Sequence, residues 1–247
     1  MIDRRMIDWC LSMPTSCDAL FSLVPVSDRS RQELARRMRA PGRFYHRDEH
    51  LALLWRRHRT FGQGGAFHAR PVERLVASAI AFHDAVLDTT RTDNEAASAA
   101  LWREMASAAG QLSPKEIDWV AGTIAATADH LAPWPADGLL ERARLWVLDL
   151  DLTPLGESPA IFARDSQRLR AEHMHLDTAC WNRKRLEFLA QFARAPRLFR
   201  TKVIADAFEA PARANLEREL SGWTPPPDPL QQGEGESFGK SLPLREG

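Results

Sequence analysis

The sequence predicts an all-α fold. Across most of the chain, apolar residues recur at helical spacing, and no stretch keeps up the alternation of apolar and polar residues that is typical of strands. Clusters of Gly and Pro interrupt this pattern, as they do between helices. We expect helices near residues 29–39, 46–59, 72–88, 93–109, 114–130, 138–151, 160–192 and 203–221.

Local signals place some of the boundaries between these helices. Residues 60–71 contain a glycine-rich run, which predicts a loop. Ser113 stands before Pro114 and three positions before Glu116, so we expect an N-cap, a proline at the first helical position and a capping box. The span 160–192 is expected to be two helices or one kinked helix.

Composition and charge exclude several classes of partner. The 33 basic and 33 acidic side chains give a formal net charge of +0, so no global field favours nucleic acid or an anionic membrane. No apolar run reaches the ~18–20 residues that span a bilayer, and the N-terminal segment lacks a signal-peptide core. The cysteines, Cys10, Cys17 and Cys180, match neither a zinc pattern nor a disulfide framework. We therefore expect a cytoplasmic protein.

The chain divides into a long helical part and a short polar one. Residues 1–222 are expected to form one helical domain, because no internal repeat or linker separates them. The segment 223–247 is rich in Pro, Gly and polar residues. It has too little apolar surface to offset the entropy of ordering it, so we expect a disordered tail.

Histidine is the informative residue type, because several of its eight copies stand beside carboxylates. In the segment YHRDEH, Tyr45 is followed by His46 and, four positions further on, by His50. If a helix begins near Tyr45, both imidazoles lie on one face, where they could bind one metal, or one could bind while the other donates a proton. A partly exposed helix face without a ligand is the alternative interpretation.

Acidic residues end two of the apolar helices. His83 and Asp84 close the run LVASAIAFHD, and burying this aspartate would be costly unless something such as a divalent cation compensates its charge. Asp149 and Asp151 also follow an apolar helix. Residues two positions apart on a helix point about 200° apart, so only one of these two can face a metal. Exposure to solvent is the alternative for each.

Taken together, this order of a histidine, then His-Asp, then a distant aspartate resembles the HD-domain superfamily of metal-dependent phosphohydrolases. The YHRDEH segment is similar to the Y-H-N-x-x-H motif of cyclic-nucleotide phosphodiesterases, with Arg47 in place of the asparagine. The H-D-x-x-E-D motif of stringent-response nucleotide hydrolases is matched in part, since Leu87 replaces the glutamate and Asp88 retains the aspartate.

A broader resemblance is to small bacterial proteins described as predicted metal-dependent HD-superfamily hydrolases. It covers roughly residues 43–220, through RFYHRDEHL, AFHDAVLD, DNEAASA, TIAATADH, LDLDLTPLG and ANLEREL. The resemblance implies an HD-type helical domain in which His46 is the proton donor. It favours Asp151 over Asp149, because Asp-Leu-Thr resembles the metal-binding Asp-Leu-Ser of the phosphodiesterases. The implied metal ligands are His50, His83, Asp84 and Asp151.

Two further residues could belong to the site. His130 could be an extra ligand or a phosphate contact, or a histidine that is favoured at a helix C-terminus. Glu95 could orient a metal-bound water, or it could stabilise the first turn of its helix. Tyr45, Asp88 and Asp149 complete the set of candidates. The other histidines are expected at the solvated surface: His58, His68, His173 and His175.

The resemblance implies a metal-dependent phosphohydrolase. The metal (Mn, Fe, Ni, Co, Zn or Mg, as one or two ions) would activate a water, while His46 protonates the leaving oxygen. The expected partner is a small phosphorylated molecule: a phosphomonoester, a phosphodiester or a nucleotide. The alternative is a non-catalytic HD-type module that binds metal or nucleotide and regulates a partner. A structural helical protein with incidental histidines is a third interpretation.

Overall fold

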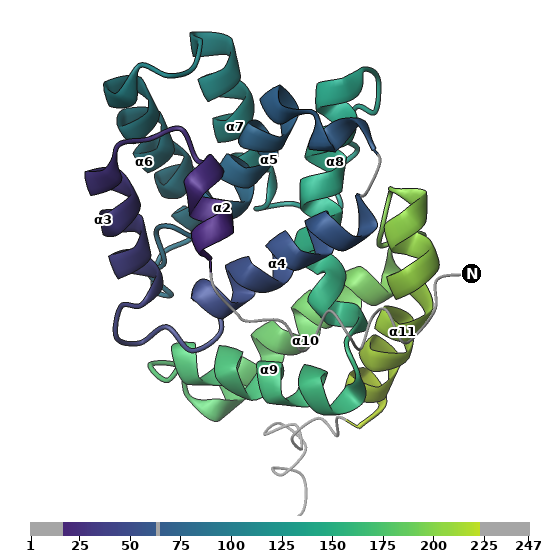
Figure 1. Ribbon diagram of the computed structural model, residues 1–247. Coiled ribbons are helices and arrows are strands. Elements are labelled where there is room, and N and C mark those ends of the chain that lie inside the picture. The colour runs from purple at the N-terminus through teal and green to yellow at the C-terminus, as the bar shows by residue number, and fades with distance from the viewer. Residues whose placement is uncertain (1–16, 63–64, 223–247) are drawn as a thin grey trace, which may run out of the picture.

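The computed structural model describes residues 17–62 and 65–222, and within these ranges the protein is all-α, without a strand (Figure 1). Cys10 and the expected tail, 223–247, lie outside the described residues. The α-helices are α2 (Asp18–Leu23), α3 (Asp28–Met38), α4 (Asp48–Phe61), α5 (Arg70–Phe82), α6 (Asn94–Ala109), α7 (Pro114–Ala126), α8 (Leu139–Leu152), α9 (Pro159–Glu172), α10 (Thr178–Arg194) and α11 (Lys202–Ser221). Two short 3-10 helices are η1 (Ala66–His68) and η2 (Thr153–Gly156). None of the described helices has both the length and the apolar character needed to cross a membrane.

Helix α5 is the central element. It packs against α2, α4, α7 and α8, and nearly all of its residues from Val72 to Phe82 are buried. Figure 1 shows α6 and α7 at one end of the molecule and α9 and α10 at the other. The rings of Phe82 and Trp102 meet edge to face, with their centroids 5.2 Å apart, and both side chains are fully buried. This packing fixes the C-terminal end of α5 deep inside the protein.

The predicted start of α7 is confirmed. Oγ of Ser113 accepts a hydrogen bond from the backbone N–H of Glu116, and the Glu116 carboxylate accepts one from the N–H of Ser113. Pro114 occupies the first helical position, where the lack of an N–H costs nothing. The span 160–192 is two helices, α9 and α10, and the carboxylate of Asp177 caps the second.

Two helix boundaries differ from the prediction next to candidate site residues. Helix α4 begins at Asp48, so His46 precedes it and does not share a helix face with His50. Oε1 of Glu172 accepts hydrogen bonds from the successive N–H groups of residues 44, 45 and 46, which holds this segment outside the helix. Helix α5 ends at Phe82 and not near 88. The carbonyl groups of residues 84 and 85 accept hydrogen bonds from Arg43 instead of from a further helical turn.

Other boundaries differ as well. Helix α7 ends at Ala126, where the N–H groups of Thr127, Ala128 and Asp129 donate to carbonyl groups three positions back instead of four. His130 therefore lies beyond the helix and not at its C-terminus. The expected loop 60–71 includes the end of α4, the 3-10 turn η1 and the start of α5. Helix α2 and the 3-10 turn η2 were not predicted, because each is too short to show a periodic pattern.

Candidate metal centre

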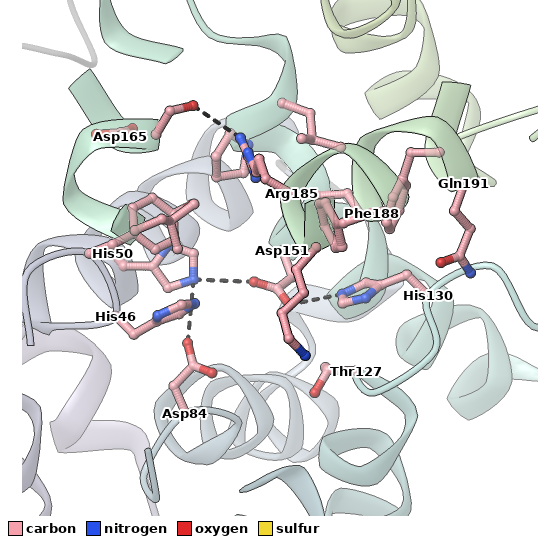
Figure 2. Close-up of a pocket in the computed structure, with 18 of the residues that line it drawn as sticks. His46, His50, Asp84, Thr127, His130, Asp151, Asp165, Arg185, Phe188 and Gln191 are labelled. Atoms are coloured by element: carbon pink, nitrogen blue, oxygen red, sulfur yellow. Dashed lines mark hydrogen bonds and ion pairs between the residues drawn. The ribbon is translucent and has the colours of Figure 1, made fainter. Parts of the chain in front are cut away.

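Three separate parts of the chain bring two imidazoles and two carboxylates together. His50 lies in the first turn of α4, His83 and Asp84 directly follow α5, and Asp151 lies in the last turn of α8. Oδ1 of Asp151 is 3.1 Å from Nε2 of His50 and 3.4 Å from Nε2 of His83. Oδ2 of Asp84 is 2.9 Å from Nε2 of His83 and 3.8 Å from Nε2 of His50. Figure 2 shows Asp151 and Asp84 both facing His50.

These distances fit the ligand shell of one metal ion. Ligand atoms about 2.1 Å from a common ion lie about 3.0 Å apart at right angles and about 3.4 Å apart in a tetrahedron. The atoms of His50, His83 and Asp151 all lie within 4.8 Å of one another, and Asp84 adds an oxygen at the same place. Nitrogen and carboxylate donors together suit a transition metal better than calcium.

The hydrogen bonds of His83 strengthen this fit. Its Nδ1–H donates to the carbonyl of Ile80 over 2.9 Å, which turns Nε2 toward the cluster, as an outer hydrogen bond orients a metal-binding histidine. Nε2 of His83 and Oδ2 of Asp84 are both buried, and neither makes a hydrogen bond within the described residues. A lone pair of a neutral imidazole and a carboxylate oxygen at 2.9 Å repel each other unless they share a cation, which can be a proton or a metal ion. The Nδ1 atom of His50, in contrast, is buried without a partner there.

The electrostatics of the cluster favour positive charge. Burial alone would lower the pKa of His83, but the charges of Asp84 and Asp151 raise it well above its ordinary value. Burial would likewise raise the pKa of Asp151, yet the charge of His83 and the hydrogen bonds from His130 and His50 hold it well below its ordinary value. The pKa of Asp84 is lowered against burial by the charges of His83 and His46. Both carboxylates are therefore ionised and ready to bind a cation.

His130 acts on Asp151. Its Nε2 donates to Oδ2 of Asp151 over 2.9 Å, while Oδ1 of the same carboxylate faces His50 and His83. The three labelled side chains His50, Asp151 and His130 form a row in Figure 2. In this arrangement His130 orients the carboxylate.

Asp149 lies apart from the cluster. Its carboxylate is fully buried and accepts hydrogen bonds from the backbone N–H groups of Arg200 and Thr201 and from the hydroxyl of Thr201, just before α11 begins at Lys202. Burial raises its pKa, although the hydrogen bonds from Thr201 and Arg200 act in the opposite direction. The structure thus places Asp151 beside the two imidazoles and gives Asp149 a separate role at the N-terminus of α11.

Glu172 was not predicted as a site residue, yet it holds His46. Nδ1–H of His46 donates to Oε2 of Glu172 over 2.6 Å, and Oε1 accepts the three backbone N–H groups described above. Burial would lower the pKa of His46, but the charge of Asp84 and the hydrogen bond to Glu172 raise it. The imidazole is therefore held at Nδ1, while Nε2 is left for another partner.

Arg43 is a second residue that the sequence pattern does not reveal. Its buried guanidinium donates to the carbonyl of His46 over 2.7 Å and to that of Asp84 over 2.8 Å. It thereby ties together the two non-helical segments that carry His46 and Asp84. Burial lowers the pKa of this arginine, although the charges of Asp84 and Glu172 act in the opposite direction. Three carbonyl groups accept its hydrogen bonds.

The cluster opens into a pocket of about 450 Å³. Tyr45, His46, Glu95 and His130 line this pocket, so the structure brings these candidates together with the cluster. Tyr45 is half-buried, and burial and the charge of Asp151 raise its pKa well above the ordinary value. Asp88 does not line the pocket; it is exposed and accepts hydrogen bonds from the N–H and the hydroxyl of Thr90.

A second group of residues of metal-binding types is His58, His68 and Glu73. The rings of His58 and His68 stack at 4.6 Å with only 9° between their planes, so one ion cannot lie in the plane of both rings. Nδ1 of His58 accepts a hydrogen bond from the indole N–H of Trp146, which leaves the ring proton on Nε2. Burial and the charges of His68 and Arg59 lower the pKa of His58 to about 3. This group is a ring stack around the buried His58, and its geometry suits a metal ion less well than that of the first group.

The expectation that His58 lies at the surface is therefore wrong. Its side chain is fully buried between the rings of Trp55 and His68. His68 and His173 are half-buried, and only His175 of these four histidines is exposed, as expected. Stacking on tryptophan and the hydrogen bond from Trp146 allow a neutral imidazole to pack as a core residue.

A scan against protein-family models finds no match to this chain, and searches of curated proteins and of solved structures find none either.

Proposed function

We propose that the protein is a metal-dependent phosphohydrolase of the HD type. The observation that carries the proposal is the convergence of His50, His83, Asp84 and Asp151 at a pocket that His46 also lines. A metal site alone would fit many functions. Here His46 lies in the same pocket, and the buried carboxylate of Glu172 binds its Nδ1, which leaves Nε2 to donate a proton. A metal site beside such an imidazole fits hydrolysis with proton transfer to a leaving group.

The four ligands would hold a divalent ion, with Mn, Fe, Co, Ni and Zn as the ions that this donor set suits, and Mg as a further candidate. When bound, such an ion polarises a phosphoryl oxygen and lowers the pKa of a coordinated water toward neutrality. His130 would keep the Asp151 carboxylate in the orientation that ligation needs. Arg43 would hold Asp84 and His46 at fixed positions relative to each other by donating hydrogen bonds to their carbonyl groups.

His46 would act as the general acid. Its Nδ1 proton is engaged by Glu172, so the proton on Nε2 of the imidazolium is the one that can be given to the leaving oxygen of a phosphate ester. The carboxylate of Glu172 stabilises this imidazolium and fixes its direction. Glu95 lines the same pocket and would be placed to orient a water.

The dimensions of the pocket support a small phosphorylated substrate. A volume of about 450 Å³ lies in the range of about 300–1,000 Å³ that is typical of small-molecule sites. Its walls combine the polar cluster with apolar side chains such as Leu131, Leu155 and Phe162. A phosphomonoester, a phosphodiester or a nucleotide meets these requirements.

The direct test is hydrolysis. Purified protein is supplied with each candidate metal and assayed against a panel of phosphomonoesters, phosphodiesters and nucleotides. We expect turnover that a chelator abolishes and that is absent in Asp151→Asn but retained in His68→Ala, whose imidazole belongs to the ring stack around His58. Binding of metal and phosphate compounds without any turnover would instead support the regulatory-module alternative, and turnover by Asp151→Asn equal to that of the wild type would contradict the proposal.

A further inference from the structure

One face of α10 forms part of the wall of the pocket. Trp181, Arg185, Phe188 and Phe192 recur every three or four positions along this helix, and all four line the pocket. In Figure 2, Arg185 and Phe188 lie above the row formed by His50, Asp151 and His130. Phe188 is 43% exposed, although it is a large apolar residue, and its ring lies 4.7 Å from that of Phe192. The helix therefore presents aromatic surface and a cation to the same space.

Arg185 lacks an ionic partner within the described residues. Its Nη2 donates to the hydroxyl of Ser166 over 3.0 Å, whereas its Nε is buried and has no hydrogen-bond partner there. None of the ion pairs in that part of the chain includes Arg185, and the charge of Glu219 acts on it only from a distance. An arginine stays charged at any physiological pH, so this half-buried guanidinium has unused capacity to bind an anion.

Two other charged side chains of α9 and α10, Asp165 and Lys184, also line the pocket. Asp165, the carboxylate on the facing helix α9, is already paired with Arg164 and Arg168. Lys184 adds a second cation to the wall that α10 forms. In Figure 2 the labelled carboxylates of the cluster, Asp151 and Asp84, lie below Arg185, so an elongated anion with two charged groups could place one at the metal and the other at α10.

The aromatic rings define what lies between these ends. The guanidinium carbon of Arg185 is 5.8 Å from the centroids of both Phe162 and Phe188, so two aromatic rings lie beside the cation. Rings in these positions exclude water around the guanidinium, which strengthens a hydrogen bond from it to an anion. They also offer apolar contact to the body of the ligand.

On the basis of the proposed function, we propose that Arg185 binds a second anionic group of the substrate. The substrate class is then an organic phosphate whose apolar or aromatic body separates the phosphoryl group from another phosphate or a carboxylate. Arg185 selects the substrate and takes no part in the reaction. The guanidinium suits this role because its fork of N–H groups can bind a carboxylate or a phosphate with two hydrogen bonds.

Binding of non-hydrolysable analogues tests this inference without relying on turnover. The probes are phenylphosphonate and 4-carboxyphenylphosphonate, together with the corresponding pair built on biphenyl, titrated calorimetrically into protein loaded with Mn(II). In at least one pair we expect the carboxylated compound to bind about 10-fold more tightly or better, since a charge-assisted hydrogen bond contributes this much. Arg185→Gln should remove the difference, while the affinity for the member of each pair that lacks the carboxylate stays the same.

The controls separate Arg185 from the helix as a whole. Arg183→Gln changes an exposed arginine on the same helix that does not line the pocket, and it should keep the preference. Arg185→Lys should keep part of it, and thermal melts of all variants check the fold. Equal binding within both pairs by the wild type, no binding of any probe, or an equal loss for both members of a pair in Arg185→Gln would overturn the inference. If the preference is present but no phosphate ester is hydrolysed, the proposed reaction fails and the role of Arg185 stands.

Discussion

Nδ1 of His46 lies 2.6 Å from Oε2 of Glu172, although the two residues are 126 positions apart in the sequence. Glu172 is the last residue of α9, and His46 precedes the first turn of α4. This hydrogen bond joins the C-terminal end of α9 to the segment that leads into α4 and the candidate metal centre. It gives His46 one fixed orientation in a segment that has no helical hydrogen bonds of its own.

Glu172→Gln should weaken catalysis without removing the metal. The amide cannot stabilise an imidazolium as a carboxylate does, so we expect kcat on an alkyl phosphate to fall by about 10- to 100-fold, the range for an outer hydrogen-bond partner. Metal content measured by elemental analysis should not change. Glu187→Gln, on the exposed side of α10, serves as the control. An equal loss of rate on esters with good and poor leaving groups would indicate a merely structural role.

The carboxylate of Glu172 should also make the free energy of unfolding depend on pH in the acid range. Burial would raise the pKa of Glu172, but the hydrogen bond and charge of His46 and the backbone N–H groups of His46 and Tyr45 lower it to about 2. Because this value lies below the pKa of 4.5 in the unfolded chain, Glu172 stabilises the folded state above pH 4.5, and the contribution is lost as the pH falls toward 2. Urea denaturation should therefore show a gap in unfolding free energy between wild type and Glu172→Gln that narrows as the pH falls through this window. A difference in unfolding free energy that widens as the pH falls would contradict the predicted direction of this pH dependence.

Alanine variants of His46 and His50 should lose different properties, rate alone or rate and metal together, and this difference separates the two roles. His46→Ala should keep its metal and lose roughly 10²–10⁴-fold on an alkyl phosphate, the range typical of general acid catalysis. Its loss on a p-nitrophenyl ester should be much smaller, because that leaving group departs without a proton. His50→Ala should be both metal-poor and inactive. If His46→Ala is the metal-free variant and His50→Ala keeps the ion, the two assignments are reversed.

The site residues that could be predicted are those that belong to short sequence motifs. His50, His83 and Asp84 follow from short motifs at helix ends, and helical periodicity located the elements that carry them. The predicted helix ends were wrong where a distant side chain binds backbone groups that a helical turn would otherwise use. Glu172 accepts hydrogen bonds from N–H groups before α4, and Arg43 donates to carbonyl groups after α5.

Other contributions depend on tertiary contacts that no local pattern encodes. Asp149 and Asp151 have the same flanking leucines in the segment LDLDL, and only the position of the segment before α11 shows that Asp149 binds the N–H groups of Arg200 and Thr201. Arg185 is one of many arginines in the sequence, and its significance depends on the absence of a carboxylate partner within the described structure. His58 was expected at the surface because His68 and Trp146, which complete its surroundings together with Trp55 of the same helix, come from η1 and α8.

Asp149→Ala should lower stability and leave metal binding intact. The substitution removes the acceptor of the N–H groups of the half-buried Arg200 and Thr201, and a net loss of about 0.5–1.5 kcal/mol is expected for each hydrogen bond. Chemical denaturation should show this decrease in the free energy of unfolding, while elemental analysis gives the same metal content as the wild type. Loss of the metal together with unchanged stability would exchange the roles of Asp149 and Asp151.

The metal content of the purified protein tests the central claim most directly. Elemental analysis of protein prepared without chelator, supported by titration with Mn, Ni and Zn, should give about one transition-metal ion per chain for the wild type and for His68→Ala. His83→Ala should give almost none, since a lost ligand weakens the site. A wild-type protein that carries no metal and takes none up, or a His83→Ala variant that retains the ion while His68→Ala loses it, would contradict the metal centre proposed for His50, His83, Asp84 and Asp151.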